Sequence, residues 1–263
     1  MKKVLAIETT AKYASVALLL KEDKIGKKDI GSKDEKIFFK KSDKEMNHLV
    51  DLMEIIDFVL KKAGIEISDV DMVAPSIGPG SFTGIRIGVS TARALSQACG
   101  TGCIPVRTLK AMAELDRKRE DDFMHYACTI INARRNQTYA ALWLFDESGN
   151  ISEIFKQGQY MIDDLLDEIS RINEESKYPV YFYGDGIDAY FDKIEKAMKN
   201  KTFDYEIAPL NQRYQSALEV AREAYKQIEM GKKPVDYDEL FPDYMRKTEA
   251  EMKLEEGKIK INS

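Results

Sequence analysis

The stretch PSIGPGSFTGIRIGVSTARALSQACG, residues 75–100, holds the densest glycine signal of the chain and leads directly into a helical pattern. Gly78, Gly80 and Gly84 allow backbone angles and close approaches that a residue with a Cβ resists. Ser81 and Thr83 can cap the first free amides of a helix. The sequence therefore predicts a strand, a loop and a helix in that order.

Two roles are open for this loop: it binds a phosphate or it is a structural turn. Free amides at a helix N-terminus attract phosphate. The glycine spacing, however, is G-x-G-x-x-x-G, one residue longer than the dinucleotide fingerprint, and no Lys-Ser or Lys-Thr follows as in a P-loop. The spacing favours the structural turn.

The helix that follows carries a strip of small residues at every fourth position. The strip consists of Gly84, Gly88, Ala92 and Ser96. Residues four apart share one side of a helix, so another backbone can approach this side closely. The strip packs on the protein's own sheet or docks a second protein, and we interpret it as an element for both close packing and partner docking.

Composition describes an ordinary soluble protein. The 263 residues are 44% hydrophobic and 32% charged, and no apolar run approaches the roughly 20 residues that span a bilayer. Three cysteines without C-x-x-C spacing indicate neither a disulfide framework nor a zinc site, which fits the cytoplasm. A net charge of −5 with scattered lysines argues against autonomous nucleic-acid binding, although a local patch at Arg134 and Arg135 stays open.

Hydrophobic periodicity predicts alternating strands and helices. Strands are predicted at 4–7, 15–20, 37–39, 70–76, 104–106, 126–131, 138–145 and 180–183. Helices are predicted to begin with caps at Ser42 (paired with Glu45), Ser81, Thr108 and Ser216, and further helices follow in 162–169 and after Gly186. This order predicts an α/β protein of two lobes.

The helix that ends at Ala63 has more apolar surface than a helix resting on one sheet requires. Its apolar arc spans about half the circumference, and Phe58 lies on the otherwise polar side. Another part of the chain or a partner protein must cover the excess.

The candidates for chemistry are few. His48 would need a second histidine four residues on to hold a metal, but Leu52 stands there. Glu8, Thr9 and Thr10 are weak nucleotide-binding candidates, and they equally fit a strand end. Asp185 is a possible partner for them, although Gly-Asp-Gly is also a common turn. Ser81 has no assignable general base, so a covalent mechanism is disfavoured.

Several segments together resemble one family. They are GPGSFTGIRIG at 78–88, the opening LAIETT, NHLVDLMEII on the first helix, NARRNQTYAALW, YGDGI, and PDYMRKTEAE near the end. The chain is identified by them as a member of the TsaB family, also called YeaZ. The resemblance implies an actin-like, sugar-kinase and Hsp70-like (ASKHA) fold. We expect a first α/β lobe at 1–107 to which 210–247 return, a second at 108–209, and an extended or disordered tail at 248–263.

The resemblance also implies a function. Members are noncatalytic partners of TsaD in the complex that transfers a threonylcarbamoyl group to the adenosine beside the tRNA anticodon. They pair with TsaD through their first two long helices, and TsaE joins the larger complex; whether the isolated protein forms a homodimer through the same helices stays open. No cofactor is expected, and tRNA is contacted only through the complex.

The resemblance also implies which residues form the partner interface and the signature loop. The expected partner interface is Leu49, Met53, Ile56, Phe58, Leu60, Gly84, Gly88, Ala92 and Ser96. The family's signature loop is Gly78, Pro79, Gly80, Ser81, Phe82 and Thr83.

Three positions depart from the family pattern. The first-strand acid is Glu8 instead of aspartate, and Asn132 and Asn136 replace an aspartate and a glycine in the second-lobe hairpin. Losing an acid weakens metal coordination and argues against independent phosphoryl chemistry. The competing hypothesis is an independent enzyme of this fold, either an ATP-dependent small-molecule kinase or a peptidase.

Overall fold

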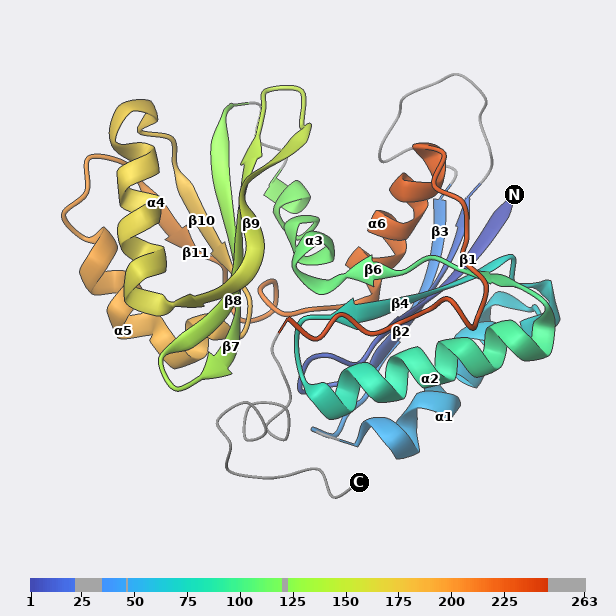
Figure 1. Ribbon diagram of the computed structural model, residues 1–263. Coiled ribbons are helices and arrows are strands. Elements are labelled where there is room, and N and C mark those ends of the chain that lie inside the picture. The colour runs from blue at the N-terminus through green and yellow to red at the C-terminus, as the bar shows by residue number, and fades with distance from the viewer. Residues whose placement is uncertain (22–34, 46, 120–122, 246–263) are drawn as a thin grey trace, which may run out of the picture.

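The computed structural model describes residues 1–21, 35–45, 47–119 and 123–245, which form two lobes side by side (Figure 1). The predicted tail at 248–263 lies outside the described residues. Among the described residues, no helix is long and apolar enough to cross a membrane.

The first lobe is built on a mixed sheet of six strands. The path runs β3-β2-β1-β4-β5, and β6 also pairs with β4. The strands are β1 (Lys2–Glu8), β2 (Ser15–Lys21), β3 (Glu35–Lys41), β4 (Met72–Gly78), β5 (Gly102–Cys103) and β6 (Val106–Arg107). β1 is antiparallel to β2 and parallel to β4.

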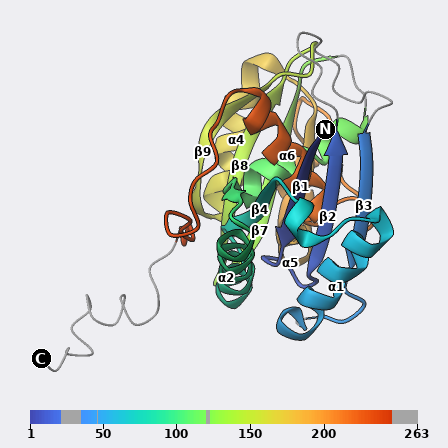
Figure 2. The same cartoon turned by 90° about the vertical axis from the view of Figure 1, so that its right-hand side faces the viewer.

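Side chains alternate across this sheet and so divide its core between two faces. Leu5 and Ile7 pack with α1 (His48–Ala63) and α2 (Phe82–Cys99), which cover the same face (Figure 2). Val4 and Ala6 pack with α6 (Ala217–Glu229) on the other face. A short 3-10 turn, η1 (Ile67–Asp69), connects α1 to β4.

The second lobe repeats the plan with five strands in the order β11-β10-β7-β8-β9. They are β7 (His125–Arg134), β8 (Gln137–Phe145), β9 (Ile151–Met161), β10 (Val180–Tyr183) and β11 (Tyr205–Ile207). α4 (Ile162–Ser176) and α5 (Gly186–Met198) cover one face, while α3 (Thr108–Ala113) packs on the other beside the fully buried Trp143. A second 3-10 turn, η2 (Asp116–Arg119), follows α3.

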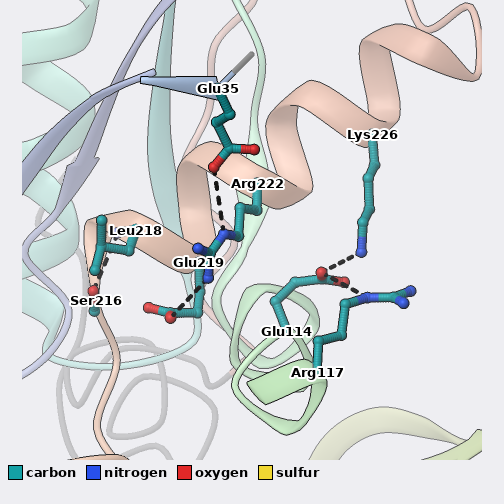
Figure 3. A network of polar contacts seen from close by, with 8 residues as sticks. All are labelled: Glu35, Glu114, Arg117, Ser216, Leu218, Glu219, Arg222 and Lys226. Atoms are coloured by element: carbon teal, nitrogen blue, oxygen red, sulfur yellow. Dashed lines mark hydrogen bonds and ion pairs between the residues drawn. The ribbon is translucent and has the colours of Figure 1, made fainter. Parts of the chain in front are cut away.

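α3 and α6 form the layer between the two sheets (Figure 1). Glu114, at the end of α3, is fully buried there, and its Oε2 accepts hydrogen bonds from Lys226 Nζ and, at 3.0 Å, from Arg117 Nε (Figure 3). Burial lowers the pKa of Lys226, against the opposing effect of Glu114. The lobe boundary predicted at residue 107 stays a prediction.

The sequence predicts the helices and strands well, but it misplaces the first residue of some helices. Ser81 caps α2 by accepting a hydrogen bond from Gly84 N, as predicted. The predicted capping box of Ser42 and Glu45 is wrong: α1 begins only at His48, because Ser42 Oγ is engaged with Lys44 O and the Asp51 carboxylate. Thr108 is the first residue of α3, not its cap.

The buried ion pair between α3 and α6 gives a first prediction. We expect Lys226→Met to destabilise the protein by about 3 kcal/mol in urea unfolding, because removing one partner leaves a buried carboxylate undercompensated. The matched control is Lys61→Met, which breaks an exposed pair with Asp57 at 2.6 Å and should barely change stability. Equal effects of the two substitutions would contradict this role of Glu114.

Candidate functional site

The turn after β1 fills the glycine loop that precedes α2. Ser81 N donates to Thr10 O at 2.9 Å, and a Cβ on Gly80 would lie 2.6 Å from the Thr10 Cβ. Thr9 Oγ1 donates to Gly84 O at 2.7 Å. Protein atoms therefore occupy the space in which such a loop would cradle a phosphate.

Glu8 is directed into the protein instead of toward a ligand. Its Oε1 accepts hydrogen bonds from Thr10 N at 2.5 Å and Thr10 Oγ1 at 2.6 Å, and its Oε2 accepts one from Ser76 Oγ. Burial raises the pKa of Glu8, and the hydrogen bonds from Ser76 and Thr10 oppose that rise. The three nucleotide-binding candidates Glu8, Thr9 and Thr10 thus lie together and satisfy one another and their neighbours.

The pocket beside Glu8 is too small for a nucleotide. Its lining includes Glu8, Thr108, Gln215 and Glu219, and it has no room for a water-sized molecule. α3 and α6 close this space from the side of the middle layer.

Asp185 lies in the turn between β10 and α5, and its Oδ1 accepts a hydrogen bond from Asn132 N at 3.1 Å. Burial raises the pKa of Asp185 to about 6, with the nearby charge of Asp188 adding to the rise and that of Lys12 opposing it. The structure shows no hydrogen bond between Asp185 and Glu8 among the contacts of the described residues; Asp185 fastens the β7–β8 hairpin to the Gly-Asp-Gly turn.

The strip of small residues on α2 faces the chain's own first strand. A Cβ on Gly84 would lie 1.9 Å from Thr9 O, and one on Gly88 would lie 2.3 Å from Thr9 Oγ1. Ala92 and Ser96 are fully buried. Direct partner contact by Gly84, Gly88, Ala92 and Ser96 is therefore wrong, because β1 and the turn after it already occupy the smooth side; the tight-packing alternative is what the structure shows.

α1 divides the remaining interface candidates into two groups. Ile56 and Leu60 lie in the core, so their predicted partner contact is also wrong. Leu49, Val50 and Met53 are 77%, 64% and 54% exposed on the first two turns of α1, and Phe58 is 40% exposed. Large apolar side chains grouped on one exposed helix face mark an interaction surface. We call Leu49, Val50 and Met53 the α1 apolar face.

His48 is a buried structural residue. Its Nε2 donates to Ala11 O at 2.8 Å, so the ring fastens α1 to the turn after β1. Among the described residues there is no group of three or more His, Cys, Asp or Glu side chains that could hold a metal ion.

The signature loop is partly accessible. Pro79 is buried, whereas Phe82 and Thr83 are exposed at the start of α2. Tyr244 lies on Phe82 with ring centroids 4.6 Å apart, and Arg86 Nε donates to Tyr244 OH at 3.1 Å. A Cβ on Gly78 would lie 2.3 Å from Asp243 O, so the segment after α6 closes over this loop.

Known proteins are similar to this chain in sequence and in fold. A family model described as TsaD, tRNA N6-adenosine threonylcarbamoyltransferase, matches residues 42–254. The chain is 28% identical to the tRNA threonylcarbamoyladenosine biosynthesis protein TsaB of Bacillus subtilis, with 95% of this chain and 96% of the relative covered. The TsaB of Haemophilus influenzae is 26% identical, with 92% and 93% covered. The chain belongs to this family, on its TsaB branch.

Solved structures support the same assignment of the fold. YeaZ from Pseudomonas aeruginosa superposes with a TM-score of 0.69 at 19% identity, covering 93% of this chain and all of that one. A second P. aeruginosa structure, described as similar to the peptidase YeaZ, gives 0.71 at 20% identity, covering 94% and 100%. The predicted architecture is confirmed: the structure has two α/β lobes with mixed sheets flanked by helices, a fold that it shares with these YeaZ structures.

Two features of the site were missed from the sequence. Val50 belongs to the α1 apolar face, and its position beside Leu49 on the same helix was the available signal. The contact of Tyr244 with Phe82 joins residues 162 positions apart, and no local pattern indicates it.

The packing of α2 on Thr9 gives a second prediction. We expect Gly84→Ala to cost about 3 kcal/mol of stability and Gly88→Ala about 1 kcal/mol, because overpacking against a fixed backbone carbonyl is worse than against a rotatable hydroxyl. Chemical unfolding monitored by circular dichroism measures both. If Gly84→Ala were as stable as the parent chain, the close approach of Thr9 to α2 would be refuted.

Proposed function

We propose that this protein is a noncatalytic subunit of a tRNA-modifying complex, and that it pairs with a TsaD-type threonylcarbamoyltransferase to support transfer of the threonylcarbamoyl group to tRNA. The relatives' names and the family model support the pathway. The observation that carries the partner role is the α1 apolar face, formed by Leu49, Val50 and Met53.

Exposure of the α1 apolar face to water is unfavourable. Three large apolar side chains on successive turns of one helix are each more than half exposed, although α1 buries Leu52, Ile55 and Val59 on its other side. Covering such side chains is favourable by roughly 25 cal/mol per Å² of apolar surface removed from water. A second helical surface laid along α1 would supply that cover.

The noncatalytic role is supported by the way the polar candidates are used. Glu8 is fully engaged with Thr10 and Ser76, and the glycine loop is filled by Thr9 and Thr10. His48 donates to a backbone carbonyl, and Leu52 stands where a second metal-binding histidine would lie. These groups hold the first lobe together.

The further partners, the cellular location, the homodimer and the lobe bounds follow from the resemblance and belong to the same proposal. TsaE would join the assembled pair, tRNA would be contacted through the complex, and the protein would work in the cytoplasm. In the absence of its partner, two copies would associate through the α1 apolar face as a homodimer. We also retain residues 1–107 with 210–247, and 108–209, as the proposed lobes.

Substitutions on α1 test the pairing. We expect Met53→Glu to weaken binding to the TsaD protein of the same organism at least thirtyfold, about 2 kcal/mol, because a charge would be buried in an apolar contact. The matched control is Met230→Glu, since Met230 is 84% exposed at the end of α6, far from α1 in the fold. Binding is measured by calorimetry, and thermal melts confirm that both variants fold. Undiminished binding of the Met53 variant would move the interface elsewhere.

Phe58→Arg is a second substitution on α1 that tests binding to the TsaD protein. Gly88→Arg, by contrast, is no interface probe, because any side chain at position 88 would collide with Thr9.

The alternative of an independent ATP-dependent kinase or peptidase has a separate test. The isolated protein, titrated with ATP and Mg²⁺ in a calorimeter, should give no saturable heat at micromolar concentrations, because Thr9 and Thr10 occupy the glycine loop. Tight binding by the chain alone would favour the enzyme.

A further inference from the structure

The second histidine lies in a buried aromatic and charged cluster that the proposed function does not use. His125, at the start of β7, is 2% exposed. Its ring stacks on Phe145 with centroids 5.1 Å apart, and Tyr181 and Phe123 approach it edge-on at 5.2 Å and 5.6 Å. The ring is thus fixed in one orientation.

Both ring nitrogens face hydrogen-bond acceptors. Nδ1 lies 2.8 Å from the backbone carbonyl oxygen of Phe123, which has no proton to give, so Nδ1 must carry one. Nε2 lies 2.6 Å from Asp116 Oδ2, and a proton must lie between these two atoms as well. A neutral imidazole has one N–H and satisfies only one of the two contacts.

The proton between the two side chains belongs to the histidine. A carboxyl group ordinarily loses its proton near pH 4 and an imidazolium near pH 6.5. Asp116 Oδ1 also accepts a hydrogen bond from Tyr183 OH at 2.8 Å, which stabilises the ionised carboxylate. The pKa of the Tyr183 phenol is raised, first by burial and then by the negative charge of Asp116.

Two arginines of the described residues lie over the aromatic rings that flank His125, and each donates to a carboxylate. Arg117 lies over the Phe145 ring at 5.8 Å and donates to Glu114, while Arg119 lies over the Tyr181 ring at 3.6 Å and donates to Glu206 at 3.0 Å. Both arginines keep their charge throughout the accessible pH range. Among the contacts of the described residues, Asp116 is a carboxylate in direct contact with the His125 ring.

We propose that the His125 ring stays protonated at neutral pH and, as an imidazolium, holds the η2 turn on the second sheet. When the ring loses its proton at higher pH, it releases this turn. Asp116 is the first residue of η2, and η2 directly follows α3 in the layer between the lobes. Loss of the proton removes either the contact to Phe123 or the contact to Asp116. The protonation state of His125 therefore determines how firmly the η2 turn, which follows α3, is held against β7.

His48 is an internal reference for the test. Its Nε2 donates to Ala11 O, whereas its buried Nδ1 has no hydrogen-bond partner among the described residues, so its geometry calls for a single N–H. The chain has two histidines in all, so ring signals in a nitrogen-15 spectrum are assigned with one variant, His125→Gln.

The experiment is a nitrogen-15 titration of the full chain from pH 6 to pH 10. We expect His125 to show two ring N–H signals and imidazolium nitrogen shifts at pH 7.5, a full unit above the ordinary imidazole transition near 6.5. We expect one N–H signal from His48. A neutral His125 ring with a single N–H at pH 7.5 would overturn the proposal.

Stability against pH gives an independent readout. Above about pH 6.5 the unfolded chain has lost the His125 proton that the folded chain keeps, so stability falls as pH rises. The unfolding equilibrium constant of the parent chain, relative to that of His125→Gln, should rise about tenfold per pH unit until His125 ionises in the folded state. Taking the ratio cancels other groups such as Asp185, whose pKa is raised to about 6. Parallel profiles of the two proteins would refute the proposal, and the spectrum of the parent chain decides the matter if the variant does not fold.

Discussion

The close approach of Thr9 to α2 is the contact on which the first lobe depends. The Thr9 carbonyl oxygen lies 1.9 Å from the point that a Cβ on Gly84 would occupy, so only glycine permits it. That approach fixes α2 on β1, brings Thr10 into the loop at Gly80, and thereby converts a glycine-rich turn that resembles a phosphate cradle into a packed core element. It also explains why a strip of small residues can be essential to the fold without touching a partner.

The middle layer follows a different rule, since charge is buried there instead of apolar surface alone. Glu114 on α3, Asp116 on η2 and Glu8 on β1 are all less than 3% exposed, and each carboxylate receives hydrogen bonds from side chains of other elements. A buried carboxylate without such donors would cost several kcal/mol. The donors Lys226, Tyr183 and Ser76 come from α6, β10 and β4, so these contacts fix how the elements meet.

Local signals in the sequence were sufficient to predict the helices and strands. They were insufficient to predict which other parts of the chain cover each face of a helix. Ser81 caps the start of α2 as predicted, because a cap acts within one turn of the helix. The start of α1 was misplaced because Ser42 Oγ binds Asp51 instead of capping a helix at its own position. Periodicity showed that Gly84, Gly88 and Ala92 share a side, but not that β1 covers it. The pairing of Glu114 with Lys226 joins positions 112 residues apart, for which a single sequence carries no signal.

The polar and apolar groups of the first lobe are used in different ways. The acid at the end of β1 and the histidine on α1 are placed where reactive groups could lie, yet each makes contacts that stabilise the first lobe: Glu8 with Thr10 and Ser76, His48 with Ala11. The α1 apolar face is unsatisfied in the isolated chain, with Leu49 77% exposed. Burying these side chains against complementary apolar groups would be favourable, because water solvates them poorly. These polar groups therefore stabilise the first lobe, while α1 presents apolar side chains at the surface.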